Sequence, residues 1–126
     1  MLLSVISSKY MANTYLFFPS ANKALDNIWN YSKDRYGTHQ AKKYMSGLHN
    51  HLQQVCEKKK IWHPLPKEHL VPSDLNIQVY CSKYEHHFIY FRLFDSGNLG
   101  VMSILHESMD LPVRLCKDLQ RIVQEQ

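Results

Sequence analysis

The densest apolar pattern in the chain lies at residues 87–106, and it predicts a β-hairpin. Residues 87–94, HFIYFRLF, are rich in the aromatic and β-branched side chains that suit a pleated, packed surface. The DSGN that follows, at 95–98, is typical of a turn, because its glycine tolerates a positive φ and its Asp and Asn bond their own backbone. Residues 99–106 then form the return strand. Since a lone hairpin is marginally stable, other elements must cover it.

Two helical patterns precede this hairpin. Apolar side chains recur at helical spacing over residues 21–36 and again over residues 41–55. Gly37 suits the end of the first helix, and Ser20 and Thr38 are candidate N-caps. A connection of about two residues forces the helices to run antiparallel, so the two segments are predicted to form a helical hairpin.

Shorter segments complete the pattern. Residues 14–18, TYLFF, predict a short strand that ends at the next residue, a proline, which cannot donate to a sheet ladder. Residues 77–84 alternate as in a half-buried strand. Residues 112–126 are amphipathic and begin with a proline, which favours a last helix. The prolines within residues 62–76 predict a loop whose apolar side chains cover one end of the core.

These elements predict an α+β fold class: an N-terminal strand and a helical hairpin packed on an antiparallel sheet of about four strands, with a short C-terminal helix. A length of 126 residues fits one domain, which we assign to residues 14–126. Residues 1–13 are expected to be a disordered N-terminal extension, with Met11 as an alternative start to Met1. The expected core residues are Leu25, Ile28, Trp29, Tyr44, Leu48, Leu52, Ile89, Phe91, Ile104 and Leu105.

The amino-acid composition limits the classes of function that the chain can have. Three widely spaced cysteines indicate reduced thiols in a cytoplasmic protein, and no apolar run is long enough to cross a membrane. The formal net charge is +4, but residues 77–110 carry two basic and four acidic groups. A weakly basic chain of this kind suits an acidic protein partner as well as it suits nucleic acid.

Eight histidines suggest a metal site, but none of them has the spacing of metal ligands. His49 and His51 are two apart on a helix, and His86 and His87 are expected on opposite faces of a strand. We therefore expect no metal and no cofactor. His106 adjoins a glutamate and a serine, which would permit acid–base chemistry, but local hydrogen bonding between strand and helix is the favoured interpretation. No catalytic residue is predicted.

The same segments carry a family resemblance. HHFIYFR at 86–92, a short turn, and ILHESMD at 104–110 resemble the C-terminal hairpin of the RelE/ParE superfamily of toxin–antitoxin toxins, on its ParE side. Residues 20–48 resemble the helical hairpin of that superfamily, with its Ile-Trp, its Gly at the bend and its Gln-Ala-x-x-Tyr. The resemblance extends over residues 14–115, which is most of the chain.

The resemblance implies the bacterial toxin of a type II toxin–antitoxin pair, of the kind that maintains plasmids or prophages, in a hetero-oligomer with its antitoxin. A ParE-like toxin inhibits DNA gyrase by binding it, so it needs a binding surface and no enzymatic activity. The resemblance therefore implies neither membrane binding nor direct sequence-specific binding of nucleic acid. A disordered antitoxin tail would fold on the helical hairpin. The expected antitoxin contacts are Trp29, Tyr36, Tyr44 and Leu48, and the expected target contacts are Arg92, Arg114, Lys117 and Arg121.

Two alternatives stay open at this point. The RelE branch cuts mRNA on the ribosome, with several cations on its sheet and a tyrosine near its C-terminus. Here the sheet offers Lys83 and Arg92, and no tyrosine follows Tyr90. Many ParE-like proteins have arginines before the aromatic strand, where this chain has VYCSK at 79–83. The second alternative is therefore an interaction domain without toxicity.

Overall fold

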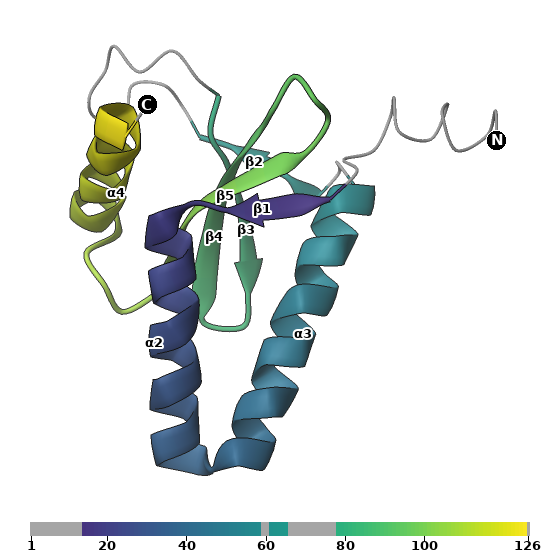
Figure 1. The fold of residues 1–126 in the computed structure, drawn as a ribbon, viewed down its shortest axis with the longest axis vertical. Helices are drawn as coiled ribbons and strands as arrows, with labels where there is room; N and C mark the ends of the chain where they lie inside the picture. The colour runs from purple at the N-terminus through teal and green to yellow at the C-terminus, as the bar shows by residue number, and fades with distance from the viewer. Residues whose placement is uncertain (1–13, 59–60, 66–77, 126) are drawn as a thin grey trace, which may run out of the picture.

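A computed structural model describes residues 14–58, 61–65 and 78–125. Their fold class is α+β, as predicted, with five strands in the sheet where about four were expected. The predicted extension at residues 1–13, the choice between Met1 and Met11, and most of the predicted loop lie outside the described residues. The elements run in the order β1 (Tyr15–Phe17), α2 (Pro19–Tyr36), α3 (Thr38–Glu57), β2 (His63–Pro64), β3 (Tyr80–Tyr84), β4 (His87–Leu93), β5 (Leu99–His106) and α4 (Leu111–Glu125) (Figure 1).

The strand order in the sheet is β1-β5-β4-β3-β2. The predicted central hairpin is β4 and β5, joined by a turn in which Gly97 has a φ of 93°. The other neighbouring strands are antiparallel as well, except that β1 pairs in parallel with β5 over residues 99–101. The short β1 thus covers only the first part of the outer edge of β5.

A β-bulge shifts the register in the middle of the central hairpin. Tyr90 pairs with Ser103 and Phe91 with Val101, which leaves Met102 without a partner on β4. Because of this extra residue, Met102 and Ser103 both meet the helix α4: Met102 joins its apolar cluster, and Ser103 donates a hydrogen bond to Asp118.

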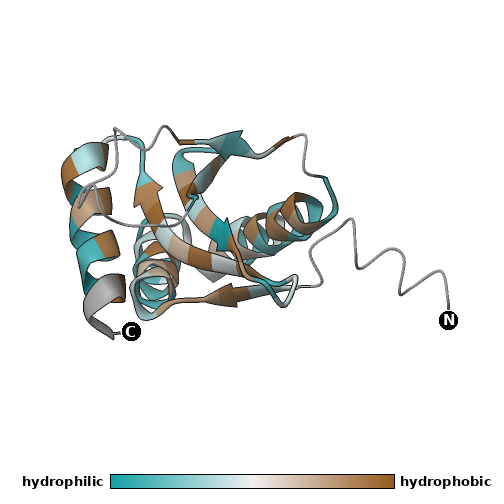
Figure 2. Cartoon of the chain, turned by 90° about the horizontal axis from the view of Figure 1, so that it is seen from above, coloured by the Kyte–Doolittle hydropathy of each residue, from teal (hydrophilic) through white to brown (hydrophobic). Residues whose placement is uncertain are grey.

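Helices cover both faces of the sheet. On one face, α2 and α3 enclose a cluster that includes Leu52, Phe91 and Ile104. On the other face, Leu115 and Leu119 of α4 pack in a second cluster with strand residues. Figure 2 shows α4 at the left, next to the C-terminus and separate from the two helices of the hairpin. The sequence predicted the hairpin layer and the last helix, but it did not assign α4 to the opposite face.

Most of the predicted core is buried. Leu25 and Tyr44 are partly buried and pack against the first cluster, whereas Trp29 is partly exposed and belongs to neither cluster, which corrects its assignment. Trp62 supports the prediction that this segment covers an end of the core, because it is 8% exposed and its Nε1–H donates to the Val55 carbonyl at 2.6 Å. Buried as predicted are Ile28, Leu48, Leu52, Ile89, Phe91, Ile104 and Leu105.

The two predicted N-caps are wrong, whereas Gly37 ends the first helix as predicted. Ser20 lies inside α2, which begins at Pro19, and Thr38 is the first residue of α3; neither helix has a side-chain capping bond. Gly37 alone connects the helices, at a φ of 91°, and its N–H donates to the Lys33 carbonyl at 2.9 Å. A positive φ is costly for residues other than glycine, so this one position sets the antiparallel hairpin.

The buried contact between α4 and the sheet generates a stability prediction. Ser103 Oγ donates to Asp118 Oδ2 at 2.5 Å, and Asp118 is 8% exposed. Replacing Asp118→Ala leaves the Ser103 hydroxyl unsatisfied in the interior, so the free energy of unfolding in urea should fall by about 1–3 kcal/mol. Asp26→Ala, at an exposed site on α2, should change it by no more than about 0.5 kcal/mol.

A double-mutant cycle isolates this contact. If the hydrogen bond is responsible, Ser103→Ala combined with Asp118→Ala should cost less than the sum of the single changes. Additive costs would show that the two groups act independently.

Candidate functional site

A largely apolar opening lies between the helical hairpin and the ends of β4 and β5. This hairpin cleft has a volume of about 560 Å³. Tyr31, Tyr36 and Met109 line it with exposed fractions of 59, 62 and 43%. They are half of the large apolar side chains that the described residues expose, and such a gathering is typical of a binding surface. The cleft is further lined by Asn27, Ile28, Ser32, Gln40, Tyr44, His86, His87, His106 and Ser108.

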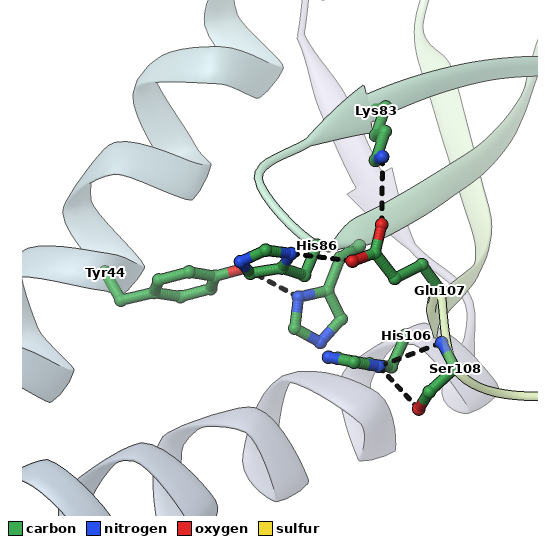
Figure 3. A network of polar contacts seen from close by, with 7 residues as sticks. Tyr44, Lys83, His86, His106, Glu107 and Ser108 are labelled. Carbon is green, nitrogen blue, oxygen red and sulfur yellow. Dashed lines mark hydrogen bonds and ion pairs between the residues drawn. The ribbon is translucent and has the colours of Figure 1, made fainter.

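Three histidine side chains meet on the sheet side of the hairpin cleft (Figure 3). The ring centroid of His106 lies 5.1 Å from that of His87 and 6.1 Å from that of His86. The expectation that His86 and His87 lie on opposite faces is wrong, because His86 precedes β4 and lies in a turn. Glu85 has a φ of 51° in that turn, so strand alternation does not apply there.

His87 is held in a neutral state by its surroundings. Burial, followed by the neighbouring His106 and His86, lowers its pKa to about 4. Its Nδ1 lies 2.6 Å from the Tyr44 hydroxyl, whose pKa is raised to about 12 by burial and by Tyr84. A phenol with this pKa keeps its proton, so Tyr44 donates to Nδ1, and the neutral His87 carries its own proton on Nε2.

Glu107 connects the β3–β4 turn with the end of β5. Its carboxylate lies 2.7 Å from His86 Nδ1 and 2.9 Å from Lys83 Nζ, and hydrogen bonds from these groups lower its pKa to about 2 (Figure 3). Next to it, His106 Nδ1 accepts the backbone N–H of Ser108 at 3.0 Å. This contact is the local hydrogen bonding that the sequence interpretation expected of His106.

A metal site and a reactive thiol each place requirements on the described residues. Within residues 14–58, 61–65 and 78–125, no three His, Cys, Asp or Glu side chains are placed to hold a metal ion. Burial raises the pKa of Cys56 and of Cys81 to about 11, so both stay thiols at neutral pH, and the thiol is the unreactive form. None of the described helices is long and apolar enough to cross a membrane.

The predicted antitoxin contacts divide into two groups. Tyr36 and Tyr44 line the hairpin cleft. Leu48 is fully buried and therefore offers no surface to a partner, which corrects its assignment, and Trp29 does not line the cleft. Sequence reasoning missed Tyr31, although it lies three residues after Ile28 and so at the margin of the same helical stripe.

The predicted target contacts also separate. Arg114, Lys117 and Arg121 are exposed on α4, but only the two arginines line a second cleft, which lies between α2 and α4. Arg92 lies on β4, with its guanidinium 4.9 Å from the ring centre of Phe94 and its Nε buried without a hydrogen-bond partner. The four cations therefore do not share one cleft.

Comparison with known proteins assigns this chain to a family. Residues 15–111 match the family model described as the ParE toxin of the type II toxin–antitoxin system parDE. The chain belongs to the ParE toxin family. The resemblance seen in the sequence is thus confirmed, while α4 lies almost entirely beyond the matched residues.

Individual relatives agree with this assignment. Toxin ParE1 of Mycobacterium tuberculosis, from strain CDC 1551 / Oshkosh and from strain ATCC 25618 / H37Rv, is 25% identical over 101 residues, which are 80% of this chain and 96% of the relative. A solved structure titled as the chromosomal ParDE TA system from P. aeruginosa matches with a TM-score of 0.56 at 15% identity. It covers 76% of this chain and 96% of the other. This structural likeness supports the ParE-like fold.

The shifted pKa of His87 predicts a pH dependence of stability. Its folded value, about 4, lies below its ordinary value of 6.5, so the unfolded chain takes up the proton first. The free energy of unfolding should therefore fall as pH decreases from 6.5, with the loss complete below about 4. Urea unfolding at several pH values measures this. Glu107 titrates in a lower window, between 4.5 and about 2, so it does not obscure the upper part.

A matched pair of variants tests the assignment to His87. Burial also lowers the pKa of His51, which adds to the decline. His87→Gln cannot titrate and should therefore make the decline between pH 6.5 and 5 shallower, whereas His39→Gln, at an exposed site on α3, should leave it unchanged. An unchanged slope in His87→Gln would assign the decline to other groups.

Proposed function

We propose that this ParE-family chain arrests bacterial growth by binding DNA gyrase in the cytoplasm, and that a cognate antitoxin neutralises it in a hetero-oligomer. The observation that carries the proposal is the hairpin cleft, where Tyr31, Tyr36 and Met109 leave apolar surface uncovered. The relatives titled ParE and ParDE support a partner of the antitoxin kind.

An amphipathic segment of the antitoxin fits the hairpin cleft best. The lining of this cleft is mostly apolar and also includes exposed polar residues such as Asn27 and Gln40. A helix laid in such a groove inserts apolar anchors at helical spacing, and a disordered tail can fold as it binds. Covering a large apolar side chain contributes about 1.5–3 kcal/mol, so a few anchors suffice to hold the segment.

Binding without catalysis is the mechanism we favour for the toxic action. A ribonuclease of the RelE kind needs several cations around one phosphate. Lys83 is paired with Glu107 and the Arg92 guanidinium packs over Phe94, so the sheet cations have other contacts. This arrangement supports a surface that acts by docking. New mRNA cleavage by translating ribosomes mixed with the protein would favour the RelE alternative.

Inducible expression in bacteria tests the proposal. Growth should stop when the chain is expressed alone and continue when its antitoxin is co-expressed. Undiminished growth with the soluble, folded chain would favour the alternative of an interaction domain without toxicity.

Truncating an exposed anchor should weaken the antitoxin complex. Tyr36→Ala removes a side chain that is 62% exposed and lines the hairpin cleft, so affinity for the antitoxin should fall about tenfold or more, with little change in folding stability. Calorimetric titration of the purified proteins measures the affinity.

The matched control for this change is Leu16→Ala. Leu16 is 50% exposed but does not line the hairpin cleft, so its truncation should leave the affinity within about twofold. Equal losses in the two variants would place the docking surface elsewhere.

The positive face of α4 is proposed as part of the target contact. Reversing Arg114, Lys117 and Arg121 to Glu should abolish growth arrest, because an acidic patch on gyrase would then be repelled, while antitoxin affinity is retained. Growth curves and co-purification with the antitoxin measure the two effects.

A second triple variant controls for net charge. Lys33, Lys42 and Lys43 are exposed on the helical hairpin, and reversing them to Glu changes the net charge equally. Growth arrest should survive in this variant. If arrest also persists after the α4 reversal, the α4 face is not part of the mechanism.

A further inference from the structure

The second cleft lies where the outer edge of β5 loses its partner strand. β1 pairs with residues 99–101 of β5, and beyond them no described strand pairs with this edge. The opening there, the α2–α4 cleft, has a volume of about 300 Å³ and is lined by residues of α2 and of α4. Ile104, Leu105 and His106 of β5 also line it.

Positive charge from two separate helices meets in this cleft. Lys23 comes from α2, and Arg114 and Arg121 come from α4; all three are exposed. None of them forms an ion pair within the described part of the chain, where the ion pairs are those of Glu107. Asp118 is the one carboxylate that lines the cleft, and it already accepts a hydrogen bond from Ser103. The cleft therefore has an excess of uncompensated cations.

Two histidines add ring N–H donors to the same cleft. His106 Nδ1 accepts the Ser108 backbone N–H, so the other ring nitrogen, Nε2, carries a proton. His87 has the same tautomer, because its Nδ1 accepts a hydrogen bond from the Tyr44 hydroxyl. Both rings line the α2–α4 cleft as well as the hairpin cleft. N–H donors and cations thus dominate the polar lining, and their natural complement is an anion rich in acceptor oxygens.

We propose that the α2–α4 cleft binds a phosphate-bearing ligand. Two guanidinium groups suit phosphate oxygens in particular, because each presents a planar set of N–H donors, and a lysine adds a point charge. A volume of about 300 Å³ is at the lower end for ligand sites and accommodates a diphosphate group. The phosphate belongs either to a free nucleotide or to a nucleic-acid backbone. This site goes beyond the docking of antitoxin and gyrase, and it makes no use of the apolar hairpin cleft's exposed tyrosines.

Inorganic pyrophosphate is the first probe, titrated into the full chain by calorimetry at low ionic strength, where exposed charges are least screened. The double variant Arg114→Gln with Arg121→Gln should weaken binding by at least about tenfold, and Lys23→Gln should weaken it from the opposite helix. Lys117→Gln is the matched control, because it removes one positive charge from the same helix outside the cleft. Its affinity for pyrophosphate should stay within about twofold of that of the native chain.

Competition then separates the two sources of phosphate. If ADP displaces pyrophosphate and a short single-stranded DNA does not, the natural ligand is a free nucleotide. If the DNA displaces pyrophosphate, the ligand is the phosphodiester backbone of a nucleic acid. No pyrophosphate binding by the native chain, or equal binding by the double arginine variant, would overturn the proposal. Thermal unfolding of each variant shows that it is folded. Antitoxin affinity and growth arrest are measured separately, so a failed phosphate site leaves the proposed function standing.

Discussion

The rest of the structure depends on β5, a strand that is buried on both faces. Every residue of β5 except His106 is buried, and its side chains enter both apolar clusters. A strand without a solvent face must be covered twice, so the helical hairpin and α4 are both required. The bulge at Met102 fits the strand to this task, because it directs two successive residues, Met102 and Ser103, to α4.

The same strand determines where the two proposed binding surfaces lie. His106 ends β5 directly opposite His87 on β4, so the pairing that builds the core also brings the histidine rings together. β1 covers only the start of β5, which leaves space beside its far end between α2 and α4. The hairpin cleft and the α2–α4 cleft therefore meet at the end of β5 and share these two histidines.

Local signals in the sequence were sufficient for the central hairpin, whose turn and return strand match the prediction, since glycine placement and aromatic density are local. Long-range packing could not be predicted from the sequence. Periodicity shows that α4 has an apolar side but not which sheet face it meets. It also cannot separate the middle of a stripe from its margin, so fully buried Leu48 and exposed Tyr36 looked alike. His86 was misplaced because nothing in the sequence marks the positive φ of Glu85.

The most direct test of the account is a supercoiling assay with purified gyrase, relaxed plasmid DNA, ATP and increasing amounts of the purified chain. We expect supercoiling to decline as the chain is added and to recover when its antitoxin is added, because the proposal has the chain bind gyrase and the antitoxin bind the chain. Full supercoiling at a large molar excess of folded chain over gyrase would contradict the account.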